Sequence, residues 1–65
     1  MSQFFLAKND RQLGICLRML LAEGINGIMV EQFVNERDKI EFHISAGMDE
    51  QTFDMLSKKY RILIS

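Results

Sequence analysis

The chain contains no proline and no tryptophan, and it has a single cysteine and a single histidine among its 65 residues. Without proline, no helix or strand is interrupted by a residue that lacks a backbone N–H. One cysteine excludes an intramolecular disulfide, and one cysteine with one histidine cannot supply the four ligands of a structural zinc site. We therefore expect neither a bound metal nor a cofactor.

Charge of one sign and long apolar runs are also missing. The formal net charge is −1, which gives no field that would attract a polyanion, so a nucleic-acid partner is not expected. The apolar runs are far shorter than the ~20 residues of a membrane span, and the first residues lack the layout of a signal peptide. The resulting expectation is a soluble, cytoplasmic protein that does not enter a membrane.

The short length limits the size of the core. Sixty-five residues leave room for one domain, which we expect to span residues 1–65. A core of this size supplies only ~3–5 kcal/mol of net stability. The hydrophobic fraction of 48% fits either a minimal core or an additional surface for association.

Hydrophobic periodicity predicts six elements. Leu13, Cys16, Leu17 and Leu20 recur at helical spacing, Asn9 and Gln12 can form a capping box, and a glycine at position 24 can end that helix; Leu21 extends the same stripe. Residues 40–45 alternate between apolar and polar, as in a strand with one buried face. The expected strands are 3–7, 26–34, 39–45 and 61–64, and the expected helices are 10–23 and 48–60.

This order predicts an α+β, ferredoxin-like βαββαβ sandwich, in which a four-stranded antiparallel sheet carries two helices on one face. The first and third strands would be central, and the second and fourth would be the edges. The expected core consists of Leu17, Leu20, Val30, Ile40, Phe42, Ile44, Phe53 and Leu56.

Few residues suggest catalysis, and we do not expect an enzyme. Cys16 lies on the apolar stripe of the first helix, where a cysteine is usually inert. His43 lies between Glu41 and Ser45 on the outward face of its strand, which is typical of a solvated or partner-facing surface. The polar start of the first helix, residues 9–12, either caps the helix or holds a small zwitterion.

The run Asn9-Asp10-Arg11-Gln12-Leu13-Gly14, followed by Gly24-Ile25-Asn26, resembles the signature of the ACT domain. The resemblance implies a regulatory βαββαβ module that commonly binds an amino acid at a subunit interface. The proline that this family carries before the glycine is absent here, and Gly27 replaces a large apolar residue. Carried over to this chain, the resemblance implies ligand contacts from Asn9, Asp10, Gln12, Gly14 and Asn26.

The functional hypothesis is a stand-alone regulatory module of ACT type, which senses an amino acid or modulates a partner enzyme through a dimer interface. The alternative is a protein-interaction or inhibitor module that docks an edge strand on a larger protein without a small-molecule ligand. Ile15, Met19 and Ala22 form a second apolar stripe on the predicted first helix, opposite the core-facing leucines. Together with Met29, this stripe predicts a homodimer interface.

Overall fold

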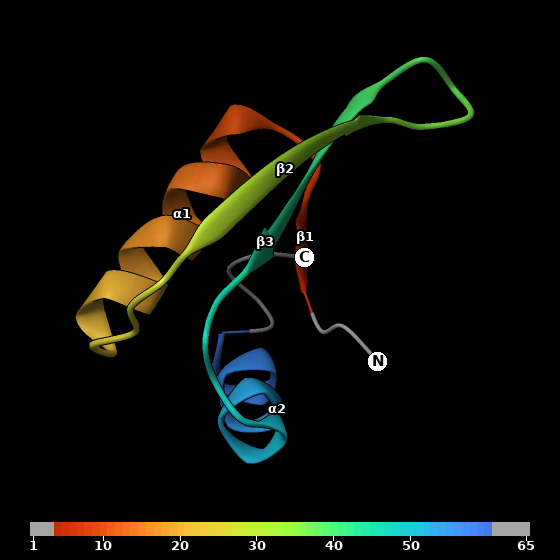
Figure 1. Cartoon of the computed structure of the whole chain (residues 1–65). Coiled ribbons are helices and arrows are strands. Elements are labelled where there is room, and N and C mark those ends of the chain that lie inside the picture. Colours follow the sequence, from red (N-terminus) through yellow and green to blue (C-terminus); the bar gives the residue numbers. More distant parts are fainter. Residues whose placement is uncertain (1–3, 61–65) are drawn as a thin grey trace.

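A computed structural model of the chain describes residues 4–60. Its elements follow the expected order: β1 (Phe5–Ala7), α1 (Asp10–Ala22), β2 (Met29–Val34), β3 (Ile40–Ser45) and α2 (Glu50–Lys59). Figure 1 shows these elements along the chain. Residue 3 of the expected first strand and the whole expected last strand, residues 61–64, lie outside the described part.

The predicted four-stranded ferredoxin-like sheet is wrong. The sheet has three antiparallel strands in the order β1-β3-β2. Within residues 4–60, β3 alone is central and β1 forms an edge, whereas we expected both strands to be central. An apolar run shows that a segment is able to form a strand, but strand pairing depends on contacts between distant segments that periodicity does not encode.

Both ends of α1 are closed by the residues that the sequence predicts. The Asn9 side chain accepts a hydrogen bond from the Gln12 backbone N–H (2.8 Å), and the Gln12 side chain accepts one from the Lys8 N–H (2.7 Å). At the other end Gly24 has φ 73°, and the Ile25 N–H donates to the Leu20 carbonyl. This is a Schellman ending, for which glycine is preferred because it has no Cβ.

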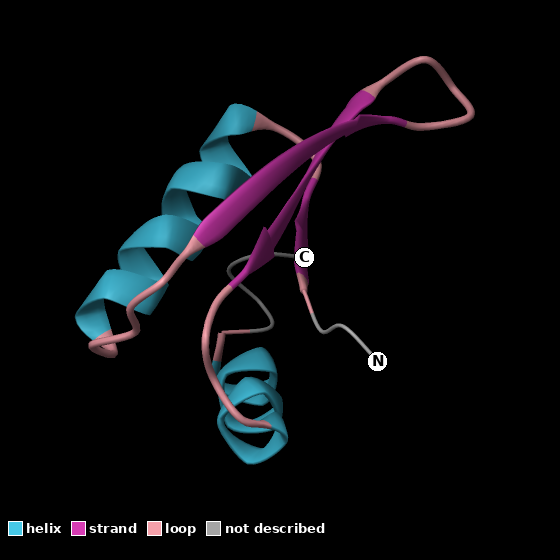
Figure 2. Ribbon diagram, viewed as in Figure 1, coloured by secondary structure: helices cyan, strands magenta, loops and turns pink. Residues whose placement is uncertain are grey.

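The predicted hairpin of β2 and β3 is confirmed. The two strands pair from Met29 opposite Ser45 to Val34 opposite Ile40. Figure 2 shows that the far end of this hairpin projects beyond both helices. Residues near that end therefore have no helix to cover them.

The core lies between one face of the sheet and the two helices. Its members are Phe5, Ala7, Cys16, Met19, Leu20, Ile44 and Leu56, and the Phe5 and Phe53 rings are 4.7 Å apart. Among the expected core residues, Leu20, Ile44 and Leu56 are buried, and Leu17, Phe42 and Phe53 pack against them. Val30 and Ile40 are instead 44% and 47% exposed, because Val30 lies on the edge strand β2 and Ile40 lies beside the projecting turn.

Helix α1 is rotated relative to the expected face. Cys16, Met19 and Leu20 are its buried residues, whereas Leu21 is 69% exposed. The expectation that Met19 lies on an outward stripe is therefore wrong, since the inward face is centred on these three positions. Neither described helix is long and apolar enough to cross a membrane.

Candidate functional site

One face of the sheet carries no helix within the described residues, and we call it the outer face. The strand register assigns Leu6, Glu31 and His43 to this face, because these residues lie opposite one another across the three strands. Phe33 and Glu41 form the next pair on the same face. Four large apolar side chains of this face are between 38% and 59% exposed: Phe4, Leu6, Met29 and Phe33.

Three aromatic rings form a stack across the outer face. The imidazole of His43 is 4.3 Å from the ring of Phe4, nearly parallel to it, and 4.3 Å from the ring of Phe33. The His43 Nε2 is 3.8 Å from a carboxylate oxygen of Glu41. The imidazole contacts both phenyl rings, and the nearby carboxylates of Glu31 and Glu41 disfavour a polyanion as the partner of this outer-face stack.

Strand β2 borders the outer face and forms one edge of the sheet. All six of its residues are exposed, and among residues 4–60 only β3 pairs with it. An edge strand presents backbone N–H and C=O groups that another strand can pair with. On the helix side of this edge, Val30 and Val34 are 44% and 63% exposed. The edge therefore combines open backbone groups with apolar side chains.

The residues that the ACT resemblance implies as ligand contacts do not form one site within the chain. Asn9 and Gln12 hold the start of α1 through the capping bonds, and Asp10 is exposed in its first turn. A Cβ added at Gly14 would meet nothing within 4 Å, so no close contact requires glycine there. Asn26 follows the opposite end of this 13-residue helix, which is about 20 Å long.

The four residues of the expected dimer interface also do not lie on one exposed surface. Ile15 is half-buried, and Ala22 and Met29 are exposed, but Met19 is 4% exposed and belongs to the core. Met29 lies in β2, whereas the other three lie in α1. Of these four positions, Met29 is the one on the exposed sheet edge.

Helices α1 and α2 are joined at their C-terminal ends by a polar cluster. The Glu23 carboxylate accepts a hydrogen bond from the Lys59 ammonium (2.8 Å) and another from the Tyr60 hydroxyl (2.7 Å). These bonds from Lys59 and Tyr60 lower the pKa of Glu23. Since Lys59 and Tyr60 of one helix end both bond to the Glu23 carboxylate of the other, the cluster fixes the two helix ends and is better suited to a structural role than to acid–base chemistry.

No described side chain is arranged for nucleophilic chemistry or metal binding. Cys16 is 1% exposed, and burial raises the pKa of its thiol to about 11, which opposes formation of the reactive thiolate. Within residues 4–60 no three His, Cys, Asp or Glu side chains gather where they could hold a metal ion.

Sequence reasoning missed the outer-face stack, although it predicted that the second strand is an edge of the sheet. It assigned His43 correctly to the outward face, but it did not place Phe4 and Phe33 beside it. The available signal was the alternation of Met29, Glu31 and Phe33, which puts these three side chains on one side of β2.

The sequence matches no protein-family model, no curated protein and no solved structure at a significant level. Nothing in these comparisons identifies an ACT domain. The candidate site therefore rests on the geometry of β2 and the outer face.

Proposed function

We propose that this chain is a protein-interaction module that pairs with a second copy of itself through β2. The observation that carries the proposal is that β2 is an edge strand whose six residues are all exposed. Two antiparallel β2 strands would join two three-stranded sheets into one sheet of six strands. The open backbone groups of both edges would then be satisfied in a single contact.

The side chains of β2 favour one register for this pairing. If Gln32 lies opposite the Gln32 of the second copy, Val30 of each chain lies opposite Val34 of the other, and Glu31 opposite Phe33. A shift that centres the pair on Glu31 places two carboxylates directly opposite each other, which is destabilising. The register centred on Gln32 covers the exposed valines and separates these charges, so the strand is self-complementary.

Pairing would also extend the outer face. Each chain contributes an outer-face stack of Phe4, His43 and Phe33, and a continuous sheet would carry both stacks on one side. Met29 would lie at the end of the paired segment, in agreement with its place in the expected dimer interface. Such a combined surface would bring the exposed apolar side chains of two chains together on one side of the sheet, which suits it to binding a protein partner.

The register can be tested by charge exchange at Val30 and Val34. One variant carries Val30→Lys and Val34→Lys, and the other carries Val30→Glu and Val34→Glu. Each variant alone places like charges opposite each other and should sediment as a monomer. An equimolar mixture places Lys opposite Glu at both positions and should regain twice the mass of 7.6 kDa.

The matched control is Met55→Lys, because Met55 is 53% exposed on α2 and lies outside the pairing surface. This variant should dimerise like the unaltered chain. Because both valines are exposed, their substitution should leave the fold intact. An unaltered chain that sediments as a monomer in the micromolar range would overturn the pairing and leave β2 to a different protein.

A further inference from the structure

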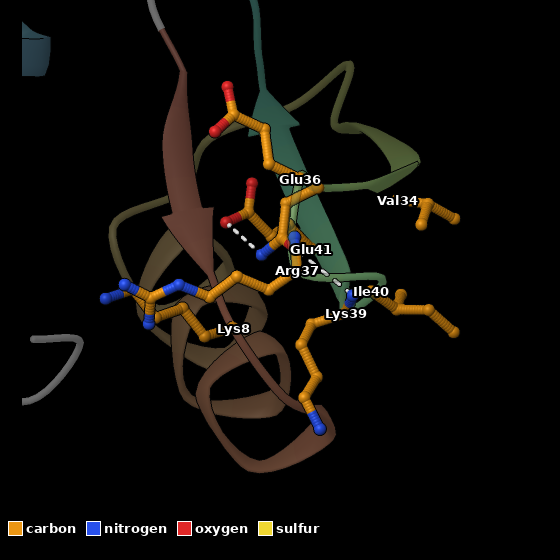
Figure 3. Close-up of a pocket in the computed structure, with 8 residues that line it drawn as sticks. Lys8, Val34, Glu36, Arg37, Lys39, Ile40 and Glu41 are labelled. Carbon is orange, nitrogen blue, oxygen red and sulfur yellow. Dashed lines mark hydrogen bonds between the residues drawn. The ribbon is translucent and has the colours of Figure 1, made fainter.

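A hollow of about 760 Å³ lies beside the turn of the hairpin. Figure 3 shows the residues around it, which come from two distant parts of the chain. Lys8 directly follows β1. Arg37 lies in the hairpin turn between β2 and β3, and Lys39 directly precedes β3. The pairing of β1 with β3 places all three cationic residues along the lining of one hollow.

The lining of the hollow contains three cations and two carboxylates, Glu36 and Glu41, and so has an excess of one positive charge. Within residues 4–60, neither Lys8 nor Arg37 nor Lys39 has a carboxylate oxygen within 4.0 Å. Glu41 lines the hollow as a carboxylate, and one of its oxygens accepts a hydrogen bond from the Asn35 amide (3.1 Å). In Figure 3 the Glu36 carboxylate points away from Lys39, while Arg37 extends toward the side of Lys8.

The turn that carries Arg37 and Lys39 is held in one conformation. The Asn35 side-chain oxygen accepts hydrogen bonds from the backbone N–H groups of Arg37 (2.9 Å) and Lys39 (3.0 Å). The Asn35 N–H donates to the Lys39 carbonyl, and the Asp38 N–H donates to the Asn35 carbonyl. The backbone positions of both cations are thus fixed before any ligand arrives, which lowers the entropy lost on binding.

We infer that this hollow binds a phosphate group, either as the free ion or as the monoester of a small molecule. Three cations line the hollow, and a phosphate offers three terminal oxygens and nearly two negative charges to them. A carboxylate has two oxygens and one charge, so it engages fewer of these groups. The inference does not require pairing through β2, because the three cations lie outside that strand, although its Val34 also lines the hollow.

The test is a titration of the ¹⁵N-labelled chain with inorganic phosphate at constant ionic strength. The backbone amide signals of Lys8, Arg37 and Lys39 should shift together and saturate. Arg37→Gln and Lys39→Gln should each weaken phosphate binding by about two- to five-fold. Arg18→Gln is the matched control, because Arg18 is exposed on α1 and does not line the hollow.

Two further ligands, acetate and phenyl phosphate, show which class of anion the hollow binds. Acetate should bind more weakly than phosphate at the same amides. Phenyl phosphate that saturates the same signals identifies a monoester site, whereas phenyl phosphate without effect restricts the site to the free ion. Shifts that rise without saturation, or that are equally weakened by Arg18→Gln, would overturn the inference. The amide dispersion of each variant shows whether it is folded.

Discussion

Replacing Leu20 by Ala should leave most molecules unfolded in water or at a low urea concentration. The same change at Leu21 should leave them folded. The two residues are neighbours in α1, but Leu20 is 0% exposed and Leu21 is 69% exposed. Truncation of a buried leucine costs about 2–5 kcal/mol, because apolar contacts are lost and a cavity remains. The expected stability of a domain this small is only ~3–5 kcal/mol. Truncation of an exposed leucine changes the stability by about 0.5 kcal/mol or less.

Urea denaturation followed by far-ultraviolet circular dichroism measures both variants. The Leu→Ala change alters helix propensity in the same way at both positions, so the difference between the variants reports burial alone. With a slope of about 1 kcal/mol per molar urea for a small domain, the two midpoints should differ by about 2 M or more. Equal midpoints would show that α1 does not pack with the face that contains Cys16, Met19 and Leu20.

Two further predictions concern titratable groups. Because the pKa of Glu23 is lowered in the folded chain, its bonds to Lys59 and Tyr60 contribute stability that is fully present above the ordinary pKa and is lost as the pH falls through the folded value. When the pH is lowered below about 4.5, the melting temperature should therefore decrease, and it should decrease less steeply in Glu23→Gln than in the unaltered chain. Identical pH profiles of the two proteins would contradict the role of the cluster. The pKa of Cys16, raised from 9.0 to about 11, reduces the thiolate fraction about a hundredfold at pH 8, so iodoacetamide should label Cys16 slowly in buffer and rapidly in urea. Equal labelling rates in the two conditions would show that the thiol is not buried.

The local elements of the fold could be predicted because their signals lie within a few residues of one another. Asn9 and Gln12 are three positions apart and cap α1, and Gly24 ends it. The hairpin follows from two strand-forming runs around a polar turn that begins at Asn35. In each case the hydrogen bonds that fix the element join residues close in sequence.

The arrangement of the elements could not be predicted in the same way. The leucine spacing of α1 gave a helix with an apolar side, but it did not show that Met19 faces the sheet and Leu21 faces solvent. Val30 and Ile40 are apolar, as core residues usually are, yet Val30 lies on the edge strand β2 and Ile40 lies beside the projecting turn. Burial at these positions depends on where distant elements end, which a periodic pattern does not contain.

In the candidate site, too, local features could be predicted from the sequence and contacts between distant segments could not. The polar residues at the start of α1 suggested a ligand site, but the hydrogen bonds of Asn9 and Gln12 are used in capping. The outer-face stack joins Phe4, Phe33 and His43 from three separate segments, so it depends on the registers of both strand pairs. The hollow beside Arg37 likewise requires Lys8 to come close, which only the folded sheet achieves.

The pairing of β1 has a consequence for synthesis of the chain. Phe5 pairs with Ile44, and Ala7 pairs with Phe42, so β1 leaves the ribosome long before its partner strand. At the usual rate of about 5–20 residues per second, β1 waits on the order of seconds for β3 to emerge. During that time the aromatic Phe5 has neither the sheet nor Phe53 to pack against. The nascent chain therefore carries an exposed apolar segment, followed directly by Lys8, Asn9 and Asp10, whose polar side chains oppose aggregation of the segment before the sheet closes.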